Sequence, residues 1–185
     1  MKLTLHYYGD PILREPAQPV DTIDEAIREL AQAMIRTMHQ ESGIGLAAQQ
    51  IGRNTAICVI DLLPEMDVDD DDQRLHPDIA MPWVLINPKI VTTDATAWVR
   101  EEGCLSFPQI TANIQRPWTI ELVYRDLDGA EHQRTVSGML ARVVQHEVDH
   151  LNGVLFIDRM SHVKKFALKG KLKRLREETR AQQEG

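Results

Sequence analysis

The chain of 185 residues contains only two cysteines, Cys58 and Cys104, and it lacks any long run of apolar residues. Its apolar stretches extend over a few residues, whereas a helix that crosses a bilayer needs about 20. Residues 1–6 lack the apolar core of a signal peptide. We therefore expect a cytoplasmic protein without a membrane segment, in which both cysteines are thiols.

The sequence also lacks an excess of positive charge, internal repeats and any Gly/Ser-rich linker. Its 21 Lys and Arg oppose 28 Asp and Glu, for a net charge of −7. This balance argues against a DNA-binding protein, although it permits a local basic patch. A length of 185 residues and an apolar content of 43% suit one globular domain.

Periodic apolar residues predict three helices. A capping box of Thr22 and Glu25 predicts the first, which ends near residues 41–43. Ser137 opens a second helix that runs to Leu151, and a third is expected over residues 163–182. The proline-rich residues 9–20 predict an extended lead-in. Strands are expected at residues 55–60, 83–87, 89–93, 118–125 and 132–137, with Cys58 in the core.

Six acidic residues lie within residues 65–72, in a segment bounded by Pro64 and Pro82. We expect a solvated or mobile surface loop here. A cation site is the less favoured alternative, because the segment has neither a glycine turn nor an ordered spacing of ligands. We assign no chemistry to it.

The segment Gln145-His146-Glu147-Val148-Asp149-His150 carries the clearest chemical signal. On a helix, His146 and His150 lie on one face and can bind one metal ion, while Glu147 can reach a ligand of that ion. Such a pattern is typical of metal-assisted hydrolysis. The alternative is a pair of hydrogen-bonded core histidines.

A third ligand cannot be taken from the familiar protease patterns. Phe156 occupies the position of a third histidine in HExxHxxGxxH, and Lys169-Gly170-Lys171 lies where a downstream glutamate would be expected. Cys104 is the strong upstream candidate, since Gly103 permits close approach of the backbone. A Cys/His/His site leaves a fourth position for water, and ligand chemistry alone favours Zn²⁺.

Residues 43–52 read GIGLAAQQIG. They are not a dinucleotide fingerprint, because the G-x-G-x-x-G spacing is absent. Small residues here would let the backbone pass close to another backbone or to a substrate, and a glutamine that follows them could donate to an oxyanion.

These three motifs, GIGLAAQQIG at 43–52, EGCLS at 102–106 and QHEVDH at 145–150, resemble in identity and order those of the peptide deformylases. Asp10-Pro11-Ile12-Leu13-Arg14 and Pro19-Val20 are also similar to the family's opening, so the resemblance covers roughly residues 3–160. It implies removal of the formyl group from the N-formylmethionine of nascent bacterial polypeptides. It also implies an α+β fold in which antiparallel sheets surround a central HExxH helix, with an N-terminal and a C-terminal helix.

The resemblance also implies roles for individual residues. Cys104, His146 and His150 would hold one divalent ion, Fe²⁺ in the cell, which Zn²⁺, Ni²⁺ or Co²⁺ may replace. Glu147 would take a proton from the metal-bound water and deliver it to the leaving amine. The Leu105 N–H and the Gln50 side chain would stabilise the oxyanion, while Gln49 has no role. The catalytic domain would span residues 1–162, with a basic helical extension of the same domain at 163–185.

A peptide substrate would lie along the small residues and an apolar strip of the second helix. Met139, Val143, His146 and His150 share one face of that helix, so an apolar path leads to the metal. Core packing is the alternative for Met139 and Val143, and Arg142 faces either substrate or solvent. The expected substrate-binding residues are Gly43, Ile44, Gly45, Gly103, Met139 and Val143.

The C-terminal segment is basic, with seven cations in residues 164–176: Lys164, Lys165, Lys169, Lys171, Lys173, Arg174 and Arg176. It reads as a solvated helix or, by the family resemblance, as a contact with ribosomal RNA.

The motifs also leave two other functions open, a HExxH endopeptidase and a metal-containing binding module without activity. Phe156 argues against the first, and the complete set of Glu147, Gln50 and three ligands argues against the second.

Overall fold

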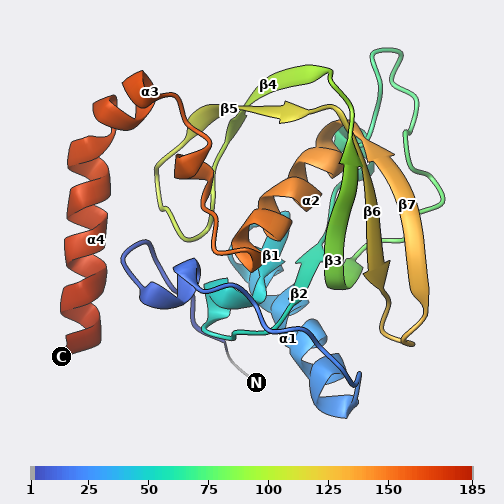
Figure 1. The fold of residues 1–185 in the computed structure, drawn as a ribbon, viewed down its shortest axis with the longest axis horizontal. Coiled ribbons are helices and arrows are strands. Elements are labelled where there is room, and N and C mark those ends of the chain that lie inside the picture. The colour runs from blue at the N-terminus through green and yellow to red at the C-terminus, as the bar shows by residue number, and fades with distance from the viewer. Residues whose placement is uncertain (1–2, 185) are drawn as a thin grey trace.

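The computed structural model describes residues 3–184 as two antiparallel sheets and four α-helices (Figure 1). The larger sheet has the order β1-β2-β3-β6-β7 and the smaller pairs β4 with β5. The strands are β1 Gly45–Ala47, β2 Ile57–Ile60, β3 Trp83–Thr93, β4 Ala97–Glu102, β5 Ala112–Pro117, β6 Thr119–Arg125 and β7 Glu131–Ser137. The expected α+β class with antiparallel sheets is confirmed. The outer domain limits at residues 1 and 185 lie outside the described residues.

Helix α2, Gly138–Leu151, begins directly after β7 and lies against the larger sheet, with further contacts to β5 (Figure 1). Ser137 is its N-cap residue, as the sequence predicts, and Asn152 is its C-cap residue. Its side chains Leu140, Val144 and Val148 belong to a core cluster shared with β2, β3 and β6. Burial of apolar surface on several sides therefore fixes the position of this helix.

Helix α1, Glu25–Gln40, lies on the same sheet and presents Leu30, Met34 and Met38 to β2. The predicted apolar stripe is confirmed, but the predicted capping box is wrong. Asp24 is the N-cap residue, and its carboxylate accepts a hydrogen bond of 3.0 Å from the Ile27 N–H. A short acidic side chain directly before the helix satisfies the free N–H, so Thr22 is not needed.

Several other elements differ from those expected. The two strands predicted at 83–87 and 89–93 form the single strand β3, whose register with β6 shifts between Ile86 and Lys89, beside Asn87, where φ is 52°. The proline-rich lead-in contains a short 3-10 helix, Pro11–Arg14, because the Asp10 carboxylate caps it. The predicted C-terminal helix divides at Leu168 into α3, His162–Ala167, and α4, Lys169–Glu184.

The acidic segment is only partly the solvated loop that the sequence predicts. Asp70, Asp71 and Asp72 are exposed, but Asp67 is 1% exposed and accepts a hydrogen bond of 2.6 Å from the His76 ring. Cys58 is fully buried in β2, as expected. Among residues 3–184, no helix combines the length and apolar character needed to cross a bilayer.

Candidate active site

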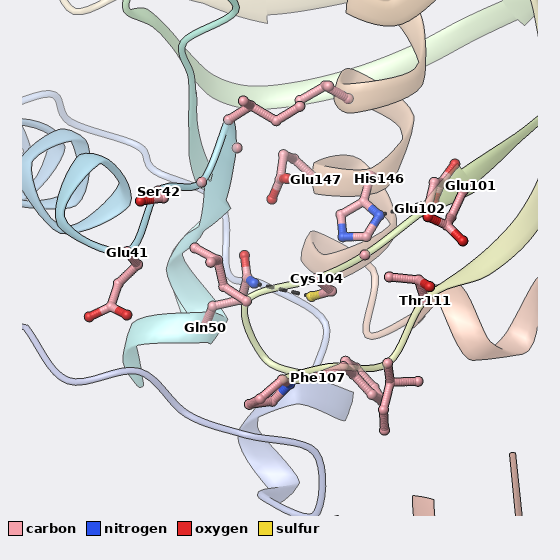
Figure 2. A pocket seen from close by; sticks show the side chains of 18 of the residues that line it. Glu41, Ser42, Gln50, Glu101, Glu102, Cys104, Phe107, Thr111, His146 and Glu147 are labelled. Atoms are coloured by element: carbon pink, nitrogen blue, oxygen red, sulfur yellow. Dashed lines mark hydrogen bonds and ion pairs between the residues drawn. The ribbon is translucent and has the colours of Figure 1, made fainter. Parts of the chain in front are cut away.

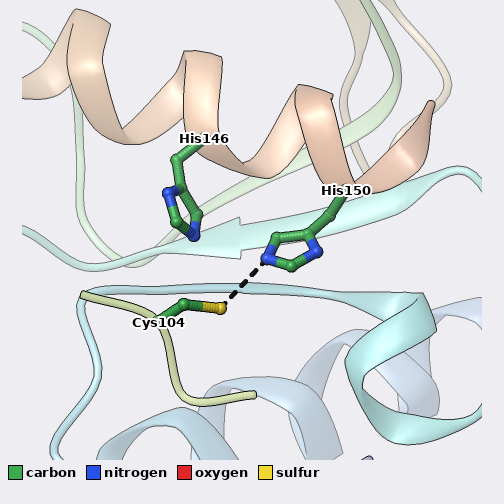
Figure 3. Close-up of side chains that lie close together, drawn as sticks. All are labelled: Cys104, His146 and His150. Carbon is green, nitrogen blue, oxygen red and sulfur yellow. Dashed lines mark hydrogen bonds between the residues drawn. The ribbon is translucent and has the colours of Figure 1, made fainter. Parts of the chain in front are cut away.

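Cys104, His146 and His150 converge although the cysteine lies more than 40 positions upstream. Their ligand atoms all lie within 4.8 Å of one another, and Cys104 Sγ is 3.2 Å from His150 Nε2 (Figure 3). Two successive turns of α2 present the imidazoles, whose ring centroids are 5.0 Å apart. Cys104 approaches from the segment that follows β4.

This donor set fits a divalent metal ion. Glu102 Oε2 lies 3.2 Å from His146 Nδ1, which leaves the other ring nitrogen for the centre. Burial lowers the pKa of His150 well below its ordinary value, so its ring is neutral, as a ligand must be. His150 Nδ1 has no hydrogen-bond partner among residues 3–184, which argues against a satisfied core histidine.

Glu147 lies one position beyond His146 and its side chain is 3% exposed. Burial raises its pKa to about 7. A Cβ atom at Gly45 would overlap Glu147 Oε1 and would lie 3.0 Å from Val143 Cγ1, so only glycine leaves room for the carboxylate there. This carboxyl group can therefore both accept and donate a proton near neutral pH.

Gln50 reaches the same centre from the short 3-10 helix Ala48–Ile51 (Figure 2). Its Oε1 accepts a hydrogen bond of 2.8 Å from the Ala47 N–H. Its Nε2 donates to Cys104 Sγ at 3.4 Å and to Ser106 Oγ at 3.3 Å. The backbone contact fixes the amide with its NH₂ group toward the centre. Gln49 instead donates to the Glu15 carbonyl, at 3.3 Å.

A cavity of about 720 Å³ joins these groups (Figure 2). It is lined by all the site residues expected from the sequence except His150: Gly43, Ile44, Gly45, Gln50, Gly103, Cys104, Leu105, Met139, Val143, His146 and Glu147. Leu105 packs closely on Gly43, where an added Cβ would lie 2.8 Å from Leu105 Cδ1. Sequence reasoning missed further lining residues, among them Tyr7, Met66 and Phe107.

Comparison with known proteins identifies the chain's relatives. The model of the polypeptide deformylase family matches residues 2–166. The chain belongs to the polypeptide deformylase family. It is 44% identical to the peptide deformylase of Opitutus terrae, over 98% of this chain and 96% of that protein. As a deformylase, it is a metal enzyme that acts on N-formyl peptides.

Solved deformylase structures have the same fold. A peptide deformylase from Synechococcus elongatus in complex with actinonin is 44% identical, with a TM-score of 0.80 over 91% of this chain and 87% of that one. The Plasmodium falciparum enzyme is 34% identical, with a TM-score of 0.83 over 96% of this chain and 98% of that one.

Behind His146, this deformylase holds a cluster of buried charges that the sequence did not reveal. Arg116 Nε lies 2.6 Å from Glu102 Oε1, and Arg116 Nη1 lies 2.8 Å from Asp149 Oδ2. Burial alone would raise the pKa of Glu102. The hydrogen bonds from His146 and Arg116 outweigh this effect and hold the pKa of Glu102 well below 4.5. The charged carboxylate therefore orients the His146 ring.

Arg142 belongs to the same cluster and does not face solvent. It is 2% exposed, forms an ion pair with Glu102 and lies over the Trp98 ring, 4.7 Å from its centroid. Its partners lie 40 and 44 positions upstream. Such ion pairs leave no local pattern in the sequence. The only hint of them is that two acids, Glu102 and Asp149, lie next to motif residues.

Proposed function

We propose that this chain removes the formyl group from the N-terminal formylmethionine of newly synthesised polypeptides, in the bacterial cytoplasm. One observation carries the proposal: a thiol, two imidazoles and the buried carboxyl group of Glu147 converge on a single cavity. The catalytic domain would extend over residues 1–162, with residues 163–185 as a basic helical extension of it.

Helix α2 would be the central metal-binding helix, with Cys104, His146 and His150 as the protein ligands of one divalent ion. We expect Fe²⁺, with Zn²⁺, Ni²⁺ or Co²⁺ able to substitute, because a thiolate and two imidazoles suit several first-row metals. A bound divalent ion supplies Lewis acidity and lowers the pKa of a water ligand. Glu102 supports this role by fixing the tautomer of His146.

Glu147 would act as general base and then as general acid. It would accept a proton from the attacking water and deliver it to the amine that leaves. A pKa of about 7 matches this double role, since a proton carrier works best near the operating pH. Gln50 Nε2 and the Leu105 N–H would donate hydrogen bonds to the negative oxygen that develops on the formyl group.

The remaining cavity residues would bind the first residue of the peptide. Gly43, Gly45 and Gly103 carry no side chain that would block the peptide backbone. Ile44, Met139 and Val143 line the same cavity and would surround the unbranched methionine side chain. Close packing of Gly45 against Glu147 supports a backbone that passes directly beside the reacting group.

The decisive experiment compares two substrates on protein purified without oxygen and loaded with Fe²⁺. We expect formate release from formyl-Met-Ala-Ser and no cleavage of an internally quenched, unformylated peptide. Cleavage of only the unformylated peptide would assign an endopeptidase, and binding of formyl-Met-Ala-Ser without any hydrolysis would assign a binding module.

We also propose that the basic residues between Lys164 and Arg176 contact the ribosome. Truncation would be a poor test, because α4 packs on the domain: Leu172 is 6% exposed, and a Cβ atom at Gly9 would lie 2.8 Å from the Arg176 carbonyl oxygen. Exposed lysines without an ion pair in the described residues, at positions 164, 169 and 171, can be changed without disturbing that packing.

We expect the triple variant Lys164→Gln, Lys169→Gln, Lys171→Gln to co-sediment with ribosomes several-fold more weakly at about 0.1 M salt, because each lost phosphate contact weakens electrostatic binding. Hydrolysis of formyl-Met-Ala-Ser should be unchanged. The matched control removes three exposed charges elsewhere: Arg36→Gln, Arg53→Gln and Lys89→Gln. Equal co-sedimentation of the parent chain and both variants would contradict the contact.

A further inference from the structure

The loop between β2 and β3 is organised around one buried carboxylate. Asp67 is 1% exposed. Its two oxygens accept hydrogen bonds from the His76 ring at 2.6 Å, from the His76 N–H at 3.0 Å and from Arg74 Nε at 3.4 Å. Val68 and Arg74 form an antiparallel bridge between the two limbs. The buried, charged Asp67 carboxylate therefore holds together the two segments of this loop that contain Val68 and Arg74.

His76 connects the loop to the start of α2. The Ser137 N–H donates to His76 Nε2 at 3.1 Å, and Ser137 is the N-cap residue of α2. Because Nε2 accepts, the ring proton lies on Nδ1 and is donated to Asp67. Gly138 touches the loop too, since a Cβ there would lie 2.9 Å from Leu75 Cδ1. The loop therefore contacts the start of α2, the helix that carries His146 and His150 (Figure 1).

Met66 directly precedes the buried carboxylate and reaches the cavity. It is half-buried, packs against the core cluster that contains Val143, and lines the cavity together with Ile44 and Met139. Its backbone position is fixed on one side by Asp67. An unbranched thioether adapts its shape to a flexible partner, so it suits contact with another methionine-like side chain.

We propose that Asp67 and His76 are positioning residues that hold this loop against α2. They thereby place Met66 as a specificity-determining residue in the part of the cavity that receives the first side chain of the peptide. The inference deepens the proposed function and rests on it. Neither Asp67 nor His76 lines the cavity, so both act through Met66. A merely stabilising loop would affect all substrates alike.

The test uses the metal-loaded full chain and two substrates, formyl-Met-Ala-Ser and formyl-Gly-Ala-Ser. In Met66→Ala and in His76→Ala, we expect KM for the methionine peptide to rise about ten-fold with kcat within two-fold, the size of effect typical of a lost apolar contact. KM for the glycine peptide should not change, because it has no side chain to contact Met66. Asp67→Asn should behave as His76→Ala does.

Three controls make the test sharp. Asp70→Asn repeats the change at an exposed position of the same loop and should have no effect. In the Met66→Ala background, His76→Ala should add little, because residues that act through one contact are not additive. If Asp67→Asn does not fold, His76→Ala and Met66→Ala still decide the question.

Equal loss on both peptides, or an unchanged ratio of their KM values, would overturn the assignment of Met66 while leaving the deformylase activity of the parent chain intact. Absence of formate release from the parent chain would instead overturn the proposed function. The two failures are therefore distinguishable.

Discussion

The Glu147→Gln variant is expected to hydrolyse formyl-Met-Ala-Ser with a kcat lowered between about a hundred-fold and ten-thousand-fold, the contribution usual for a positioned proton carrier. Its metal content should equal that of the parent chain, because Glu147 is not a member of the Cys104, His146 and His150 group. KM should change little, since the amide keeps the shape of the carboxyl group.

The geometry explains why this substitution separates chemistry from packing. Glu147 is 3% exposed and fits closely against Gly45. Its Oε2 has no hydrogen-bond partner among residues 3–184, so no protein group competes for it. A glutamine fills the same space but cannot accept and carry a proton. Replacement by alanine would add a cavity and would mix the two effects.

Single-turnover formate release and metal analysis of the same sample would measure the effect. Glu101→Gln is the matched control, since Glu101 also lines the cavity but is exposed on β4, and its kcat should stay within two-fold of the parent value. A Glu147→Gln enzyme that retains the parent kcat would assign the proton transfer to another group.

The sequence predicts those parts of the site that depend on local geometry. His146 and His150 are four positions apart, and a helix places them on one face whatever surrounds it. Cys104 and Gln50 are expected from short motifs that resemble those of the deformylases. The β6–β7 hairpin was also predictable, because Asp128-Gly129 is a turn signal between the two expected strands.

The remaining parts depend on contacts between distant segments. Strand β4 shows little apolar alternation, and it pairs with β5, from which the segment that carries Cys104 separates it in sequence. The acidic composition of the loop after β2 predicts solvation, yet Asp67 is buried, because it accepts a hydrogen bond of 2.6 Å from the ring of His76, nine positions later. Arg116 contacts Glu102 and Asp149, which lie 14 and 33 positions away. No local pattern encodes such partners.

We expect Arg116→Met to lower the free energy of unfolding by about 3 kcal/mol, because it leaves buried carboxylates with too few partners. Arg116 is 3% exposed, and Glu102 and Asp149 are each 7% exposed. Arg142 still contacts Glu102, and Arg159 still contacts Asp149 at 2.6 Å. The expected loss of unfolding free energy is therefore at the lower end of the range for a buried ion pair that loses one partner.

Thermal unfolding of the metal-free chain at pH 7 would measure the loss, as a melting temperature lowered by roughly 6–12 °C. Arg134→Met is the matched control. Arg134 forms an ion pair of 2.9 Å with Asp78, but these side chains are 44% and 62% exposed. An exposed pair contributes less than about 1 kcal/mol, so equal effects of both substitutions would contradict the role of burial.

Acid should reduce the difference between Arg116→Met and the parent chain. In the parent, the pKa of Glu102 is held well below its ordinary value of 4.5, so its ion pairs add stability above pH 4.5. This contribution is lost as the pH falls from 4.5 toward the lowered pKa of the folded state. The Arg116→Met variant lacks part of this stabilising contribution, so it loses less stability as the pH falls. Its deficit in unfolding free energy should therefore be largest at pH 7 and should shrink below pH 4.5, whereas a deficit independent of pH would assign the loss to packing around Arg116.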